Sequence, residues 1–343
     1  MTGPSDAGPD PTGSPEAPPA SPEPSSGPAR PGAGVFTIEG RAAPALFVVG
    51  WIATILGGAL TVGGTAGTSP LLTLLGLASL SIGLVAGAGS QAIERRARGA
   101  AYAGPSPLLV FAAAIPVTFL AAAVVGQFLE SFGVTLARPL ASLLLVALQV
   151  AVYVGLVRLL VVGTGALSWR EMGFVGSWQR ASSDAAWGAV LAGPVIAVTT
   201  VLAVLLVSIV NRSPESPLPP TGQPIGLALN LLTGAVLAPL GEEILFRGFA
   251  TTAWARTMSA GSAVLRSSIV FAIAHVIAVR GTSLDEALAI ALVGFGTRLP
   301  IAIALGFLFL RRGSIWAPIG LHAAFNGVIL VLAELAPRLP AGP

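Results

Sequence analysis

Residues 227–248 read LALNLLTGAVLAPLGEEILFRG, an apolar run that ends in two adjacent acids, Glu242 and Glu243, followed by Arg247. A membrane-spanning helix needs about 20 predominantly apolar residues, and this run is long enough. Ionisable side chains inside a span are costly and therefore mark candidate functional sites. The stretch predicts a transmembrane helix that carries polar chemistry.

The whole chain has the composition of an integral membrane protein. Of its 343 residues, 54% are hydrophobic and only 10% are charged, whereas a soluble domain carries about 25% charged residues. The lack of cysteine excludes disulfides, thiolate catalysis and Cys-ligated metals. No long basic stretch is present, so nucleic-acid binding is not expected. Arginine without any lysine, together with abundant Ala, Gly and Pro, indicates a high-G+C bacterial genome.

The apolar runs predict an all-α fold, a polytopic transmembrane helix bundle of about eight or nine spans. Pro70 and Pro107 stand at predicted span starts, where proline costs a helix least. Arg298 and Pro300 predict that the eighth run is broken or begins late. The expected spans are 44–64, 70–90, 107–128, 139–162, 185–210, 225–245, 263–279, 287–310 and 314–335.

Three parts are expected along the chain. Residues 1–40 form a Pro/Ser/Gly-rich tail that is too poor in apolar residues to fold. Residues 41–180 supply the N-terminal spans, and residues 181–337 form a second membrane domain, which the family resemblance given below implies is catalytic. Arginine-rich and arginine-poor loops alternate, which predicts a multi-pass protein of the cell membrane with its N-terminal tail in the cytoplasm.

The polar residues of the late spans form a set with defined helical spacings. Both histidines of the chain, His275 and His322, follow apolar runs. Residues four apart share a helix face, so Glu243 is expected to pair with Arg247 and to leave Glu242 free to face a cavity. By the same spacing, Asn326 stands beside His322, as two neutral donors for an oxyanion, and Phe271 stands beside His275, where its ring walls the site.

A carboxylate, an imidazole and a donor pair are the parts that peptide hydrolysis requires. Taken singly, each residue also has an ordinary structural explanation: a Glu–Arg pair at this spacing is usually a salt bridge, and one buried histidine is more often structural. Arg158 and Arg298 are interpreted as helix-end arginines that reach the interface. The polar residues of three helices together are harder to explain as separate structural features.

Three motifs resemble those of the CPBP family, which comprises type II CAAX prenyl proteases, bacteriocin-processing enzymes of the Abi group and proteins like lysostaphin resistance protein A. Glu242–Gly248, EEILFRG, resembles its EExxxR motif. Phe271–His275, FAIAH, resembles FxxxH, and His322–Asn326, HAAFN, resembles HxxxN, with Trp316, Ala317 and Pro318 before it. All three are complete and in the family's order.

The resemblance implies an intramembrane endopeptidase that acts on a membrane-associated protein or peptide, with or without a lipid modification. It implies that Glu242 and His275 activate the water, that His322 and Asn326 stabilise the oxyanion, and that Glu243 and Arg247 support the site. Members of the family have been described both as metalloproteases and as metal-free glutamate proteases. No cofactor is therefore assigned: Zn²⁺ would use Glu242 or Glu243 with His275 and His322, while Asn326 beside His322 favours an oxyanion pair.

Two other functions compete with the protease. A catalytically silent immunity or binding protein would keep the fold without the reaction. An ion or proton transporter would use the same acids and histidines as a relay, but it predicts an internal repeat and polar groups along a path through several helices. The polar groups of this chain instead cluster in its last third.

Overall fold

The computed structural model describes residues 1–3, 37–38, 41–42, 44–174 and 176–336. The predicted disordered tail, residues 1–40, therefore lies almost entirely outside the described residues. The chain divides into two units, Met1–Arg30 and Pro31–Pro343, and every described helix belongs to the second. Two short antiparallel strands, β1 (Thr37–Ile38) and β2 (Arg41–Ala42), precede the helices.

The predicted all-α fold is confirmed. Eight helical segments are long and apolar enough to cross a membrane, by length and composition, and one shorter apolar helix accompanies them. The elements are α1 (Pro44–Ala66), α2 (Pro70–Ala97), α3 (Pro107–Ser131), α4 (Arg138–Val157), η1 (Arg158–Val162), α5 (Trp178–Val190), α6 (Ala192–Val210), α7 (Pro224–Leu231), η2 (Leu232–Leu237), α8 (Ala238–Glu243), η3 (Ile244–Thr251), α9 (Thr252–Ala255), α10 (Ala260–Ala274), α11 (Leu284–Arg312) and α12 (Trp316–Leu335).

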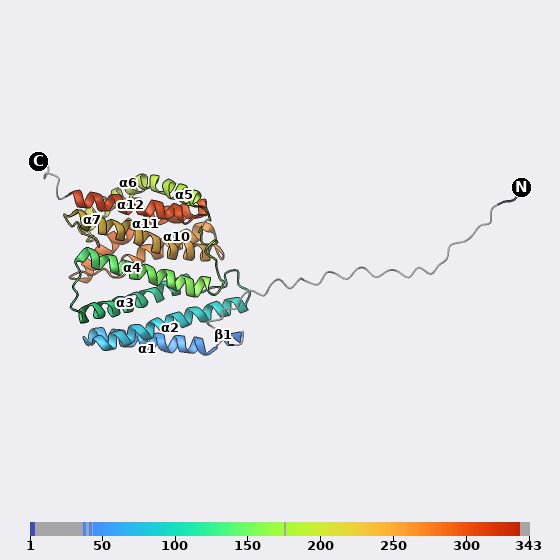
Figure 1. Cartoon of the computed structure of the whole chain (residues 1–343), viewed down its shortest axis with the longest axis horizontal. Helices are drawn as coiled ribbons and strands as arrows, with labels where there is room; N and C mark the ends of the chain where they lie inside the picture. Colours follow the sequence, from blue (N-terminus) through green and yellow to red (C-terminus); the bar gives the residue numbers. More distant parts are fainter. Residues whose placement is uncertain (4–36, 39–40, 43, 175, 337–343) are drawn as a thin grey trace. The chain divides into compact units, whose positions relative to one another are not determined.

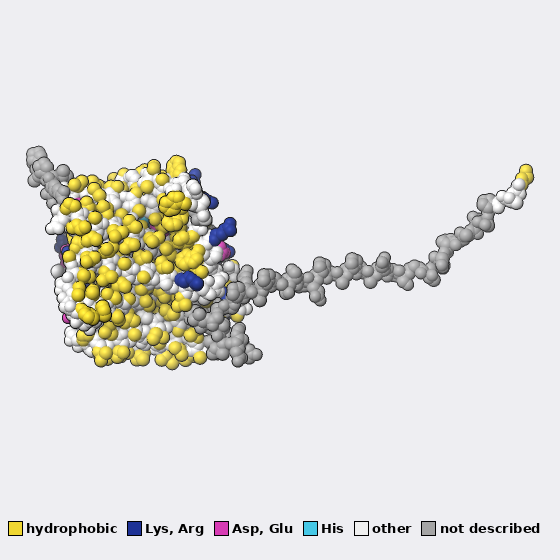
Figure 2. Space-filling model, in the orientation of Figure 1, with side chains coloured by type: hydrophobic (Ala, Val, Ile, Leu, Met, Phe, Trp, Pro, Cys, Tyr) yellow, Lys and Arg dark blue, Asp and Glu magenta, His cyan; other side chains and the backbone are white. Residues whose placement is uncertain are grey.

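The helix boundaries follow local sequence signals. Pro70 and Pro107 begin α2 and α3, as predicted, because a proline in the first turn gives up no helical hydrogen bond. The Ser69 hydroxyl accepts a hydrogen bond from the Leu72 N–H and caps α2. Between the helix ends the outward faces are apolar, and hydrophobic side chains cover the middle of the visible face, with arginines at its edge (Figure 2). Such a surface suits lipid.

The N-terminal helices stack beside the later ones. Figure 1 shows α1 and α2 at one edge, α3 and α4 next to them, and α11, α12 and α6 toward the other edge. Helices α1 and α2 approach closely because glycines line their contact. A Cβ on Gly57 would lie 2.2 Å from the Leu80 nitrogen, and one on Gly83 would lie 2.4 Å from the Thr54 nitrogen. Small residues of this kind allow transmembrane backbones to pack tightly.

Two sequence expectations about the late spans are wrong. Helix α11 runs unbroken from Leu284 to Arg312 through Pro300, because a long helix packed between neighbours tolerates the single backbone hydrogen bond that proline removes. Arg298 is the central residue of α11 and not a helix-end arginine. The interpretation of Arg158 fits better, since this residue is exposed where α4 ends.

Helix α10 is shorter than the predicted span 263–279. Its 15 residues cover about 22 Å, less than the roughly 30 Å of a hydrocarbon core. The chain leaves the helix at His275, the C-cap residue. Non-helical backbone inside a membrane is tolerated where it lines a cavity. His275, at the end of α10, lines such a cavity.

Candidate active site

The acid pair lies on a span with unusual helical geometry. Residues 224–255 form one continuous segment in which π-helical stretches, η2 and η3, flank α8 on both sides. In η3 the Thr251 hydroxyl donates to the carbonyl oxygen of Phe246, five residues earlier, at 2.8 Å. Single π-helical turns occur frequently at functional sites. Glu242 and Glu243 lie at the end of α8, between two such stretches.

Glu243 is the centre of a buried charge cluster. Its Oε1 atom lies 3.1 Å from Nη1 of Arg247 and 2.8 Å from Nδ1 of His322. The side chains of Glu243 and Arg247 are both fully buried. The expected ion pair on one helix face is therefore present, and it extends across the bundle to α12.

Arg247 has two further contacts that fix its guanidinium. Nη2 donates to the Ala302 carbonyl oxygen on α11 at 3.0 Å, and the guanidinium carbon lies 4.4 Å from the centre of the Phe271 ring. A cation over an aromatic face is favourable, more so when it is desolvated. Arg247 thus connects three helical segments, and Glu243 neutralises its charge.

The Glu242 side chain faces a cavity, away from the buried pair of Glu243 and Arg247, as its position beside Glu243 predicted. Its Oε2 atom lies 3.8 Å from Nε2 of His275 and 3.8 Å from Nε2 of His322. These separations are longer than hydrogen bonds, and Oε2 is buried without any hydrogen-bond partner. A polar gap of this width is one that a water molecule bridges. The structure therefore brings the carboxylate and both imidazoles together around one small space.

The hydrogen-bond partners of the two histidines favour one tautomer of each ring. Nδ1 of His275 lies 2.8 Å from the Phe271 carbonyl oxygen, which only accepts hydrogen bonds, so Nδ1 carries the proton. Nδ1 of His322 faces the Glu243 carboxylate in the same way. When neutral, both rings consequently direct an Nε2 lone pair toward Glu242.

Asn326 and Phe271 complete the set predicted from the motifs. The Asn326 side-chain nitrogen donates to the Gly234 carbonyl oxygen in η2 at 2.7 Å, which leaves its second N–H for another acceptor. The Phe271 ring lies 4.5 Å from the His275 ring and 5.8 Å from the His322 ring, between centroids. Phe271 therefore separates the two imidazoles from the buried Arg247, as a wall of the site.

A cavity of about 570 Å³ opens onto this group of residues. Its wall is mostly apolar and comes from α4, α6, α8, α10, α11, α12 and the segment after α6. Glu242, His275, His322, Asn326 and Phe271 all line it, whereas Glu243 and Arg247 do not. The candidate reactive residues therefore line the cavity, whereas Glu243 and Arg247, which support them, lie behind its wall.

Arg298 also lines this cavity, and the sequence interpretation missed it as a site residue. The signal was present: a lone arginine near the middle of a long apolar run is expensive unless it faces a polar interior. Gln149 and Thr297 are further polar residues on the wall, and neither belongs to a motif.

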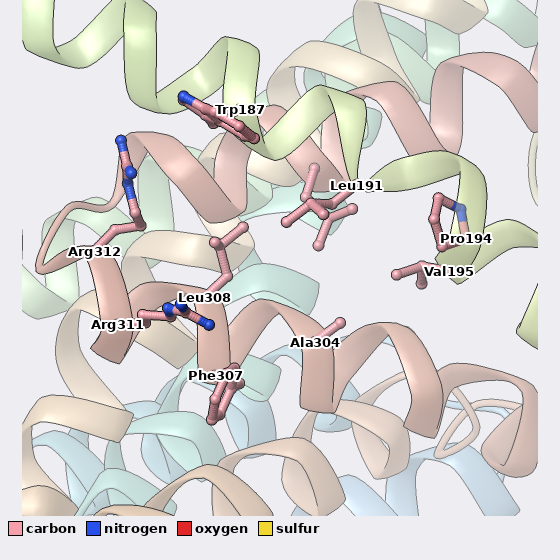
Figure 3. Close-up of a pocket in the computed structure, with 10 residues that line it drawn as sticks. Trp187, Leu191, Pro194, Val195, Ala304, Phe307, Leu308, Arg311 and Arg312 are labelled. Carbon is pink, nitrogen blue, oxygen red and sulfur yellow. The ribbon is translucent and has the colours of Figure 1, made fainter.

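A second cavity of about 530 Å³ lies between α5, α6, α11 and α12 (Figure 3). Leucines, a valine and Phe307 line it, and Arg311 and Arg312 lie together at one side (Figure 3). It contains no acid and no histidine, so it has none of the parts required for acid–base chemistry.

The donor types around Glu242 are those that zinc uses, since two imidazoles and a carboxylate form many catalytic zinc sites. Among the residues that the structure describes, however, no group of three or more His, Asp and Glu side chains is placed to hold a metal ion. The arrangement therefore does not fit a preformed zinc centre.

Residues 224–328 match a family model described as type II CAAX prenyl endopeptidase Rce1-like. A comparison with curated proteins found no match, and a comparison with solved structures found none either. The matched segment begins with α7 and ends within α12, so it contains all three motifs and both histidines. With its eight apolar helices, the chain is a multi-pass membrane protein. Its residues 224–328 are similar to a peptidase family, the CAAX-type intramembrane proteases, and this similarity supports a protease that acts on protein substrates.

Proposed function

We propose that this protease hydrolyses a peptide bond with a water molecule activated by Glu242 and His275. The observation that carries the proposal is the convergence of Glu242 Oε2 with Nε2 of His275 and of His322, each 3.8 Å away, inside one cavity. A carboxylate oxygen and an imidazole lone pair can each accept one hydrogen bond from the same water. The water oxygen then keeps a lone pair for attack on the substrate carbonyl.

The reaction follows from these positions. The water oxygen bonds to the carbonyl carbon while one of its protons passes to Glu242, and the carbonyl oxygen becomes an oxyanion. The carbon–nitrogen bond then breaks, and the departing amine takes the proton that Glu242 received. Glu242 is thereby regenerated as a carboxylate, and His275 holds the water in place.

His322 and Asn326 are proposed to stabilise the oxyanion. Asn326 can donate its second amide N–H. His322 is a donor at Nε2 only as an imidazolium, because its Nδ1 already binds Glu243. The Glu243 carboxylate stabilises that positive charge, and Arg247 holds the carboxylate in position. In this proposal Glu243 and Arg247 are positioning residues that do not touch the substrate.

The substrate segment is proposed to be apolar, because most of the cavity wall is apolar. A membrane-associated peptide, with or without a lipid modification, has this character. Arg180 in α5 donates to the Arg312 carbonyl oxygen at the end of α11, so these two arginine-bearing segments lie at the same end of the bundle. The positive-inside rule then places this end and the N-terminal tail in the cytoplasm of a cell-membrane protein.

Purified protein in lipid nanodiscs tests the proposed roles. Single-turnover cleavage of a pooled fluorogenic peptide library should fall at least about 100-fold in Glu242→Gln and in His275→Ala. Exhaustive chelation followed by gel filtration should leave the wild-type rate unchanged. Activity that disappears on chelation and returns with Zn²⁺ would overturn the water-activation scheme. Undiminished activity of Glu242→Gln would remove Glu242 from the chemistry.

A further inference from the structure

Arg298 is half-buried and lies midway along the apolar helix α11, far from both helix ends. It is the central residue of the 29-residue helix α11, so each end of the helix is about 21 Å away along the axis. An arginine stem spans only a few bonds and snorkels to an interface from the last turns of a helix. The guanidinium must therefore be satisfied inside the bundle.

The described residues satisfy Arg298 only in part. Its Nη1 donates to the Gly294 carbonyl oxygen on the same helix at 3.0 Å. By contrast, the buried Arg247 has Glu243 at 3.1 Å, and Arg312 has Asp184 at 2.5 Å. Arg298 makes no ion pair with any residue that the structure describes. A cation held away from water without an anion is destabilising, and such a residue in a membrane span is a functional-site candidate by default.

The cavity that contains the candidate active site also contains this cation. Arg298 and Glu242 line the same wall and interact electrostatically without direct contact. Glu242 is the one acid among the described cavity-lining residues, and it faces the two imidazoles. The remaining N–H groups of Arg298 are therefore available to an anionic group that enters with the substrate.

We propose that Arg298 binds a carboxylate of the substrate and thereby selects peptides that carry one close to the scissile bond. This inference rests on the proposed protease function and adds a specificity residue outside its three motifs. A guanidinium matches the planar geometry of a carboxylate through two parallel N–H bonds. The carboxylate comes either from the C-terminus of the peptide or from an Asp or Glu side chain.

The size of the cavity limits the distance between the carboxylate and the cut. An extended peptide advances about 3.3 Å per residue, so a cavity of about 570 Å³ holds only a few residues. The carboxylate is therefore expected close to the scissile bond. A charge-assisted hydrogen bond in a desolvated site changes binding by about 10- to 100-fold.

The kinetic test compares three forms of one pooled peptide library in nanodiscs. The forms have free C-terminal carboxylates, C-terminal amides, or Asn and Gln in place of Asp and Glu. Wild type should cleave a carboxylate form at least about 10-fold better in kcat/KM than its neutral counterpart, and the form that loses cleavage identifies the source. Arg298→Gln should abolish the preference mainly through KM, and Arg298→Lys should restore part of it. Arg311→Gln, on the same helix outside the catalytic cavity, should keep the preference.

A binding test needs no turnover and separates this inference from the protease proposal. N-acetyl-trileucine with a free carboxylate should raise the thermal midpoint of wild type, whereas its carboxamide should not, and Arg298→Gln should respond to neither. This result would support the carboxylate site even if no peptide were cleaved, in which case the protease proposal alone would fail. Equal stabilisation by the carboxylate and the carboxamide, or a preference that persists in correctly folded Arg298→Gln, would overturn the inference.

Discussion

Exchanging each acid of the adjacent pair for glutamine should give opposite phenotypes. Glu243 is fully buried and binds both Arg247 and His322 through one oxygen. Glutamine in its place leaves the Arg247 charge buried and unpaired, which costs about 3–5 kcal/mol. Glu242 makes no hydrogen bond through its buried oxygen, and that oxygen lies 3.8 Å from Nε2 of each histidine. Glu242→Gln should therefore lower the free energy of unfolding by about 1 kcal/mol or less.

Thermal denaturation followed by tryptophan fluorescence measures the stability difference, since the chain has six tryptophans. Glu243→Gln should lower the midpoint by roughly 6–10 °C, at about 2 °C per kcal/mol, while Glu242→Gln should change it little. Peptidase activity should show the opposite pattern, with the larger loss in Glu242→Gln. Below its midpoint Glu243→Gln should retain measurable turnover, because the amide oxygen still accepts a hydrogen bond from His322, whereas Glu242→Gln should be inactive.

A double variant tests the cause of the instability. Replacing Glu243 by Gln and Arg247 by Met in the same chain removes the unpaired cation, so this protein should be more stable than Glu243→Gln alone. Equal destabilisation by Glu242→Gln and Glu243→Gln would refute the division of roles between the two acids. Additive losses in the double variant would refute the buried-charge explanation.

Three further results are expected. Gly57→Ala should destabilise the protein by about 1–3 kcal/mol, because its Cβ would lie 2.2 Å from the Leu80 nitrogen. The neighbouring Gly58 has open space around it, so Gly58→Ala should be neutral or slightly stabilising in the same thermal denaturation experiment. Gly320 lies on α12, two residues before His322, and a Cβ there would lie 2.0 Å from the Ala185 carbonyl oxygen on α5. Gly320→Ala should therefore lower both stability and activity. An unchanged melting temperature would show that α5 and α12 can separate at this contact. Asn326→Ala should reduce kcat by about 100-fold with little change in KM if the amide acts on the transition state, and a change confined to KM would assign it to substrate binding.

The sequence predicts the class of fold, and it also predicts which polar side chains come together, because both depend on strong local signals. Apolar runs of sufficient length define the spans, and the four-residue spacing of Glu243 and Arg247 correctly predicts their ion pair. The same spacing leaves Glu242 to face a cavity, which it does. These features need only the helical repeat and the cost of charge in lipid.

Features that depend on packing between helices were not predictable in the same way. No sequence pattern indicated the π-helical stretches around α8, the early end of α10 at His275, or the contact between His322 and Glu243. The error at Arg298 has a similar origin. Pro300 suggested a helix break beside it, but packing keeps α11 continuous and leaves the arginine at the centre of the span, where it lines the cavity.

The most direct test of the central claim maps new protein termini in membranes from cells that express wild type or Glu242→Gln at equal, verified levels of folded protein. A peptidase that depends on Glu242 should produce termini that occur with wild type and are missing with Glu242→Gln. The cleaved sites should lie in apolar membrane-associated segments. Identical sets of termini in the two membranes would contradict a peptidase that depends on Glu242 and would favour a binding or immunity function for the same fold.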